Sequence, residues 1–389
     1  MGHLFRLVLE LTGKSQWANG CLPVMSPGNT EDYNMIACSC YWVAKLAEYL
    51  RHTSDTHFVN QMFDKVKKHI EYETRFIDKN GLLFETPSRR FLSWADGRPR
   101  KPYAYGETWQ KKDRKTWGDW LDEPTRGYNA IINTYWLWSL REATCIAEII
   151  GENQKCDLYK TMFENARAAF DEVFWEEQFG LYRDNVYFDR NGNKNKATFC
   201  ESTLFLMMRA EIIDKQKGLE CFRKITDPDF ICCRSSGGLE MGALTRFLID
   251  AGKTEPAIEY FLDRWGEPIK AGQTTCGEEF FHNAGNSDCH IHGATPARDF
   301  LEYLAGIKIK TAFWDEVLLV PPVDSENLPT LKASVPTPHG KIEVEIAKNQ
   351  NGAKIYRYKL PAGCRGFIRT AGIINQLEKS CGQLELPAG

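Results

Sequence analysis

The sequence predicts a mainly helical protein that ends in a small β module. Helical periodicity dominates from the start of the chain to about residue 306, and short turns join neighbouring helical segments into antiparallel hairpins. After Gly306 the sequence pattern changes to segments that alternate apolar and polar residues or are rich in β-formers, separated by turn signals. A run of hairpins in a chain of 389 residues indicates an α-solenoid or a closed ring of hairpins, followed by antiparallel strands.

The helical segments carry apolar residues at three- and four-residue steps, as Ile36, Cys40 and Val43 do within 32–53. The other predicted helices cover 57–77, 129–150, 154–174, 197–213, 236–251, 253–264 and 294–305. Gly151, Gly252 and Gly306 follow three of them, as expected of helix C-caps. No signature recurs at a fixed period, which disfavours tetratricopeptide-like arrays.

The β module begins at about residue 311. Its segments DEVLLVPPV, KIEVEIA, AKIYRYKL and GFIRTAG alternate or are rich in β-formers, with hairpin signals at His339–Gly340 and at Gly352. We therefore predict two domains, a helical domain over 1–310 and a β domain over 311–389.

A long loop without periodicity separates two helices between residues 86 and 125. Indole faces stack on sugar rings, and carboxylates bind sugar hydroxyls. The loop supplies both, in Trp94, Trp109, Trp117, Trp120, Asp96, Asp119 and Asp122. It predicts a carbohydrate site, unless the tryptophans only pin the loop to the core.

Composition narrows the possible partners. The net charge is −3, without a basic stripe that would track nucleic acid. No segment reaches the run of about 18 apolar residues needed to cross a membrane. The 13 cysteines are odd in number, and Cys232 and Cys233 are adjacent, which argues against a disulfide framework. We predict reduced thiols and a cytoplasmic location.

Carboxylates and histidines gather in the glycine-rich stretch 271–297. It contains Glu278, Glu279, His282, His290 and His292. Glycoside cleavage needs two carboxyl groups, one as acid and one as base or nucleophile, and either glutamate could supply one of them; the alternative is a solvent-exposed loop. Glu278, the three histidines and Cys289 also permit a metal reading, but no second ligand pair has zinc-site spacing. We predict no metal and no cofactor.

These segments resemble the α-L-rhamnosidases of glycoside hydrolase family 78, in which Gly-x-Thr-Thr-x-x-Glu is followed by Ser-x-Cys-His. The matching residues are Trp265, Gly272, Thr274, Thr275, Glu278, Ser287, Cys289, His290 and Pro296. Upstream, NGCLPVMSPG, the helix after Asp32 that leads to Thr53–Asp55, and FLSWAD are also similar to the family; downstream, SVPTPHGKIEVEI and YKLPAGCRGFI are similar to its β-sandwich.

The resemblance implies an (α/α)₆ six-hairpin toroid followed by a small antiparallel β-sandwich. It also implies inverting hydrolysis of terminal α-L-rhamnose from a rhamnosylated glycan or glycoside, with Glu278 as general base. By resemblance, Asp32, Trp94, Trp117, Trp120 and His290 would line the sugar pocket. Asp119, from the tryptophan-rich loop, and His292 complete the predicted sugar-binding set.

Several features depart from the family pattern. The Arg-Glu-x-Arg stretch that supplies the family's general acid has no match, and we count about ten helices where a closed ring needs twelve. We therefore expect the toroid to lack its first hairpin, and the apolar faces left exposed to favour self-association. Glu31, Glu107 and Asp119 are the candidate replacement acids. His292 stands where the family has Trp, and Ser93 where it commonly has Asp.

Two classes of function follow: a glycosidase acting on α-L-rhamnose or another terminal sugar, and a non-catalytic carbohydrate-binding remnant or incomplete enzyme without its acid. A third hypothesis is that the chain is another six-hairpin enzyme, such as an unsaturated glucuronyl hydrolase. The acidic substrate of such an enzyme needs an arginine clamp, for which only Arg98, Arg100 and Arg126 are available.

Overall fold

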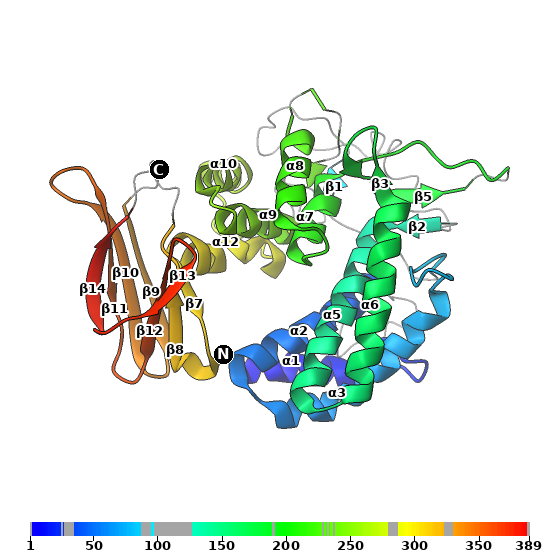
Figure 1. Ribbon diagram of the computed structural model, residues 1–389, viewed down its shortest axis with the longest axis horizontal. Helices are drawn as coiled ribbons and strands as arrows, with labels where there is room; N and C mark the ends of the chain where they lie inside the picture. The colour runs from blue at the N-terminus through cyan, green and yellow to red at the C-terminus, as the bar shows by residue number, and fades with distance from the viewer. Residues whose placement is uncertain are drawn as a thin grey trace. The chain divides into compact units, whose positions relative to one another are not determined.

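The computed structural model describes residues 2–24, 26, 35–86, 95–96, 127–188, 191–227, 229–230, 232, 234–235, 238–278, 287–322 and 330–386. They form two compact units, one up to residue 235 and the other from residue 238 onward (Figure 1). Each unit is described by itself. The predicted domain boundary after residue 310 stays a prediction.

The first unit is a set of helices joined in hairpins. They are α1 (Gly2–Lys14), α2 (Ile36–Thr53), α3 (Thr56–Glu73), α5 (Ala130–Ile150), α6 (Asn153–Phe174), α7 (Glu201–Arg209) and α8 (Lys215–Ile225), with a 3₁₀ turn η1 at Thr74–Phe76. Gly151 ends α5 at a φ of +81°, so the chain reverses into α6, which runs beside it (Figure 1). The hairpin predicted from 129–150 and 154–174 is confirmed.

Helix α5 forms the core of the first unit. Nearly all of its first half is buried, including Trp136, Leu137 and Leu140, because α2, α6 and α7 pack around it. Each such side chain contributes about 1.5–3 kcal/mol when it leaves water. The helix begins at Asn129, whose Oδ1 accepts the N–H of Ile132 at 3.0 Å.

The turn between α2 and α3 falls on the Thr53–Asp55 motif. Ser54 adopts a φ of +50°, in the left-handed region that favours glycine. Asp55 then caps α3 by accepting the N–H of Phe58 at 3.0 Å, and it also accepts the Tyr49 hydroxyl at 2.9 Å. The polar motif is thus a helix boundary.

Short strands connect the helices of this unit. They are β1 (Ala95–Asp96), β2 (Gly127–Asn129), β3 (Trp175–Glu176), β4 (Leu181–Tyr182), β5 (Asn185–Tyr187) and β6 (Arg234–Ser235). β1 pairs with β6, β2 with β5 and β3 with β4, all antiparallel. Within the predicted loop of 86–125, the described residues after 86 are those of β1.

The second unit joins helices to two four-stranded sheets. Its helices are α9 (Gly238–Asp250), α10 (Thr254–Arg264), α11 (Gly266–Lys270), α12 (Thr295–Asp299), the π-helix η4 (Phe300–Leu304) and the 3₁₀ turns η3 (Ile291–Ala294) and η5 (Ala312–Trp314). Its strands are β7 (Ile307–Ile309), β8 (Glu316–Leu319), β9 (Leu331–Thr337), β10 (Gly340–Lys348), β11 (Lys354–Lys359), β12 (Arg365–Thr370), β13 (Ile373–Gln376) and β14 (Cys381–Glu385).

The sheets have the orders β14-β11-β10-β9 and β13-β12-β8-β7 (Figure 1). β10 alternates, burying Ile342, Val344 and Ile346 while the residues between them are more exposed. The first sheet is antiparallel throughout. In the second, β8 and β12 run parallel, because the chain passes through β9, β10 and β11 before it returns beside β8.

The secondary structure agrees with the expected pattern in most places. The predicted helices and the hairpins at Gly340 and Gly352 are present, although the helix expected over 197–213 is limited to 201–209. The π-helix η4 takes over the end of the expected helix 294–305. In the described part of the chain, no helix combines the length and the apolar character needed to cross a bilayer.

Candidate active site

Glu278 lies at the end of the segment that follows α11. Its backbone N–H donates to the carbonyl of Ser287 at 2.8 Å, and the N–H of Ser287 donates back to Glu278 Oε2 at 3.0 Å. The side chain is half-buried. These two bonds fix both the backbone and the carboxylate of Glu278 against Ser287, which orients the carboxylate.

The predicted histidines lie on the segment that pairs with the Glu278 segment. The N–H of His290 donates to the carbonyl of Cys276 at 2.7 Å, and the hydroxyl of Thr275 donates to the carbonyl of Asp288. The rings of His290 and His292 have their centroids 5.2 Å apart, at 41° to each other. The structure therefore brings Glu278 and the two histidines into one small loop region.

Trp265, at the end of α10, is hydrogen-bonded to this loop region. Its indole N–H donates to the carbonyl of Gly293 at 2.8 Å. Gly293 in turn lies so close to the other segment that a Cβ added to it would be 2.3 Å from the carbonyl oxygen of Gly277. Position 293 thus admits only glycine, and the segment after His292 lies directly on the Glu278 loop.

Of the other predicted site residues, Asp96 lies on β1, where it pairs with Arg234 of β6, and the rest fall outside the described residues. They are Asp32, Trp94, Trp117, Asp119 and Trp120, together with Glu279, His282 and the candidate acids Glu31 and Glu107. Within the described ranges, no three side chains of His, Cys, Asp or Glu converge as a metal site requires.

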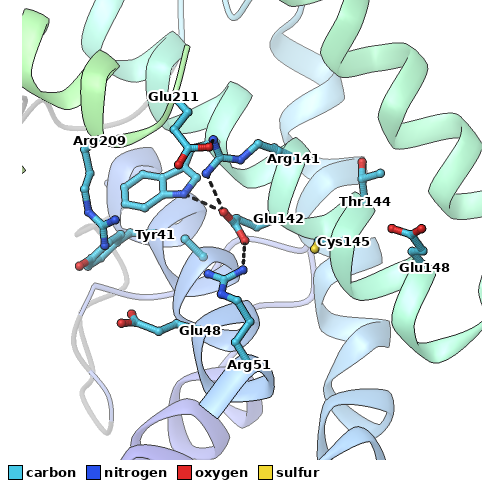
Figure 2. A pocket seen from close by; sticks show the side chains of 12 residues that line it. Tyr41, Glu48, Arg51, Arg141, Glu142, Thr144, Cys145, Glu148, Arg209 and Glu211 are labelled. Carbon is cyan, nitrogen blue, oxygen red and sulfur yellow. Dashed lines mark hydrogen bonds and ion pairs between the residues drawn. The ribbon is translucent and has the colours of Figure 1, made fainter. Parts of the chain in front are cut away.

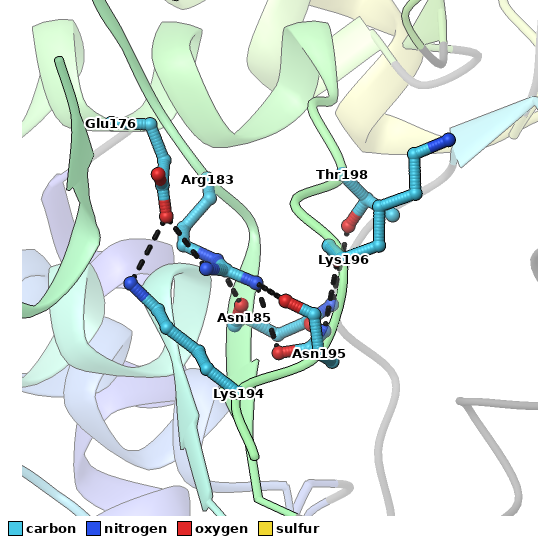
Figure 3. A network of polar contacts seen from close by, with 7 residues as sticks. All are labelled: Glu176, Arg183, Asn185, Lys194, Asn195, Lys196 and Thr198. Carbon is cyan, nitrogen blue, oxygen red and sulfur yellow. Dashed lines mark hydrogen bonds and ion pairs between the residues drawn. The ribbon is translucent and has the colours of Figure 1, made fainter. Parts of the chain in front are cut away.

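A buried arginine organises the turns between α6 and α7 (Figure 3). Arg183 is 2% exposed; it donates to Glu176 at 2.6 Å, to the carbonyl of Asn185 at 2.7 Å and to the side-chain oxygen of Asn195 at 2.9 Å. Lys194 also reaches Glu176, at 3.0 Å. Because β5 pairs with β2, this network holds the strand by which the tryptophan-rich segment enters α5.

Asp184, the next residue, was not predicted from the sequence. It is buried and accepts the hydroxyl of Thr203 at 2.7 Å and the N–H of Cys200 at 2.9 Å, which fixes the start of α7. Burial raises the pKa of Asp184 to about 7, against the opposing effect of these donors. Nothing local in the sequence distinguishes this aspartate from a solvated turn residue.

The first unit also contains a charged cleft of about 510 Å³ between α2, α5 and the end of α7 (Figure 2). At its centre Glu142 accepts hydrogen bonds from Arg51 at 2.7 Å, Arg141 at 2.8 Å and the indole of Trp138 at 3.2 Å. Arg209 lies over the Trp138 ring, 5.2 Å from its centroid. None of the predicted site residues lines this cleft. Its central ion pairs link α2 to α5, and we call this group of Glu142, Arg51 and Arg141 the clamp.

Helical hairpins followed by two four-stranded β-sheets define the fold class of this chain. The family model described as the bacterial α-L-rhamnosidase six-hairpin glycosidase domain matches residues 1–304. The chain belongs to this family. The match confirms the predicted fold class, a six-hairpin helical domain followed by β-sheet.

Solved structures share the fold at low sequence identity. The chain is similar to the family 78 rhamnosidase of Bacillus sp. GL1, with 18% identity and a TM-score of 0.77 over 95% of this chain and 37% of that one. The α-L-rhamnosidase of Streptomyces avermitilis, solved with L-rhamnose, gives 16% identity and a TM-score of 0.66 over 98% of this chain and 35% of that one. This chain thus spans well under half the length of either.

A second kind of glycosidase is also similar. The family 63 mannosylglycerate hydrolase of Thermus thermophilus matches at 13% identity with a TM-score of 0.51, over 75% of this chain and 86% of that one. Among the curated proteins no relative was found.

Proposed function

We propose that this chain acts as a glycoside hydrolase on terminal α-L-rhamnose, by inversion, with Glu278 as general base. Membership of the α-L-rhamnosidase family supports the substrate class, and a relative of the same fold was solved with L-rhamnose. The assignment of Glu278 as general base rests on the contacts of its carboxylate. Its carboxylate is oriented by Ser287 beside the segment that bears His290 and His292.

In an inverting reaction the base takes a proton from water, and that water attacks the anomeric carbon from the face opposite the leaving group. The Ser287 N–H holds one oxygen of Glu278, which fixes the direction in which the carboxylate meets the water. The imidazoles of His290 and His292 supply donors and acceptors for sugar hydroxyls. We also propose that the sugar is bound by Asp32, Trp94, Trp117, Asp119 and Trp120.

The reaction also needs a general acid to protonate the leaving oxygen. Glu31, Glu107 and Asp119 are the candidates within this sequence. A chain that has the base but no acid would still hydrolyse substrates whose leaving group needs no proton. The range of substrates hydrolysed therefore distinguishes a complete enzyme from one that lacks its acid. A carbohydrate-binding protein would hydrolyse neither kind of substrate.

Glu278→Gln should lower kcat for an aryl α-L-rhamnoside by about 10²–10⁴-fold, because the amide cannot accept the proton from water. The exposed Glu378 provides the matched control, and Glu378→Gln should leave kcat unchanged. Proton NMR of the fresh product should show β-L-rhamnose first. The α anomer as first product would rule out inversion, and full activity of Glu278→Gln would rule out the proposed base.

α-L-Rhamnosyl fluoride tests the acid in the same preparation. A complete enzyme hydrolyses both the fluoride and an alkyl rhamnoside, whereas a chain without its acid hydrolyses only the fluoride. If neither is hydrolysed while L-rhamnose binds in calorimetry, the chain is a carbohydrate-binding protein and the proposed hydrolysis is wrong.

A further inference from the structure

The turn that carries the two histidines is closed by Gly293. The N–H of Gly293 donates to the carbonyl of His290 at 3.0 Å, which closes one turn of chain around His292. This turn runs into η3 and brings the centroids of the two imidazole rings to 5.2 Å from each other. A displacement of Gly293 would therefore displace both rings.

The same turn lies on the segment that leads to Glu278. The N–H of His290 donates to the carbonyl of Cys276 at 2.7 Å. A Cβ added to Gly293 would be 2.3 Å from the carbonyl oxygen of Gly277, so the backbones of these two glycines are in close contact. The turn thus meets the Glu278 segment at two successive residues.

Trp265 attaches this turn to helix α10. Its indole N–H donates to the carbonyl of Gly293 at 2.8 Å, and its side chain is 8% exposed. The indole also packs on Phe261 of α10, with 5.5 Å between the ring centroids. Breaking a buried hydrogen bond leaves a polar group without water or a partner, which makes this attachment costly to lose. Groups held by regular helices are placed more exactly than groups on loops alone.

We propose that Trp265 is a positioning residue of the glycosidase, which sets the place of His290 and His292 relative to the base Glu278. This inference rests on the proposed function, because the roles of Glu278 and of the histidines belong to it. In that reaction the histidines bind the sugar and Glu278 directs the water, so the rate depends on the spacing between them. Trp265 acts through Gly293 and needs no contact with the sugar.

The first test is Trp265→Phe, which removes the indole N–H and keeps an aromatic ring. The kcat for an aryl α-L-rhamnoside should fall about 10–100-fold, because a misplacement of about 1 Å costs about 10²-fold in rate. The matched control is Trp42→Phe. Trp42 is 6% exposed, and its indole N–H donates to the carbonyl of Leu9 at 3.1 Å. This control loses the same kind of buried bond, so it should lower the midpoint of urea unfolding similarly while the kcat of the folded protein stays unchanged.

Gly293→Ala is a second variant that acts on the same turn. Its added methyl group would press on the carbonyl of Gly277, so kcat should fall here too. If both variants displace one turn, the double variant should lose much less rate than the product of the two single losses. Gly293→Ala also replaces Trp265→Phe if the latter does not fold. Wild-type kcat in the folded single variants would overturn the proposal, and so would fully multiplicative losses in the double variant.

Amide hydrogen exchange separates a failure of this proposal from a failure of the proposed function. Peptides that cover 287–294 should exchange faster in Trp265→Phe than in the wild type or in Trp42→Phe, because the bond that holds the turn is gone. If the wild type does not hydrolyse rhamnosides, the proposed function fails, and exchange alone decides whether Trp265 holds the turn. Unchanged exchange of these peptides would contradict the proposal even in an active enzyme.

Discussion

His69 and Glu73 are buried one helical turn apart on α3, with 3.6 Å between Nδ1 and Oε1. Burial disfavours both charges, so it lowers the pKa of His69 to about 3 and raises that of Glu73 to about 8. The two shifts act oppositely on stability. Between pH 6.5 and 8 the folded protein holds a proton on Glu73 that the unfolded chain has lost, so stability falls as pH rises. Between about pH 3 and 4.5 the unfolded chain holds a proton on the histidine that the folded protein lacks, so stability falls as pH drops.

Glu73→Gln should therefore remove the part of the stability loss between pH 6.5 and 8 that comes from Glu73. The difference between variant and wild type is expected to grow by about 1.4 kcal/mol per pH unit in this window, the value of one proton. Urea unfolding at a series of pH values measures it. Glu71→Gln, an exposed position on the same helix, should follow the wild-type profile. Parallel profiles for Glu73→Gln and wild type would show that Glu73 is ionised when buried.

Residues that a local pattern sets apart can be nominated as candidates from the sequence, whereas residues that burial sets apart cannot. Glu278 and His290 stand out because carboxylates and histidines are rare in a glycine-rich loop. Glu73 and Arg183 have no such signal, since their surroundings are assembled from distant segments. Their roles follow only from what covers them.

Among the elements, the packed helices α2 and α5 are also linked by the buried carboxylate of Glu142. Glu142 of α5 accepts hydrogen bonds from Arg51 of α2 and from Arg141 of its own helix. Arg141 also donates to the carbonyl of Ala210, just after α7, at 2.6 Å. Although burial alone would raise the pKa of Glu142, the two arginines lower it. The carboxylate thus contributes to packing as an ion, and this contribution is lost as pH falls through its pKa.

Glu142→Gln should destabilise the protein by about 1.5–3 kcal/mol, because it removes the buried charge to which two partly exposed arginines donate. The midpoint of urea unfolding measures the change. Glu148→Gln lies on the same helix at an exposed position and should shift the midpoint little. If the two variants behave alike, the clamp in Figure 2 contributes no more than a surface pair.

The long helices were the most predictable elements and the short strands the least. A period of 3.6 residues over nearly six turns locates α5 to within a residue, since its apolar face must repeat to stay buried. Strands of two or three residues, such as β3 and β5, are too short to show alternation. The parallel pairing of β8 with β12 depends on a contact across three intervening strands, which no local pattern encodes.

At the scale of the molecule, α1 presents an apolar stripe. Leu4, Leu7 and Val8, at three- and four-residue steps, are 62%, 46% and 60% exposed. We expect this stripe to drive self-association, because burying it between copies removes apolar surface from water. The double variant Leu4→Gln, Leu7→Gln should sediment as a smaller species than the wild type at equal concentration.

The exposed pair Ile373 and Ile374 on β13 gives the matched control. Replacing both with Gln should leave the sedimentation of the protein unchanged. A wild type that stays monomeric at every concentration would contradict the expected association, and an equal effect of the β13 variant would assign it to general surface hydrophobicity.

The parallel pairing of β8 with β12 also sets an order of events in time. Glu316 on β8 is paired with Arg365, so β8 is synthesised 49 residues before its partner. Until β12 emerges and closes that long loop, one edge of β8 is open. This non-local step should be slow in folding the second unit. During the interval the open edge can recruit a strand from another nascent chain, which makes the rate of synthesis a determinant of yield.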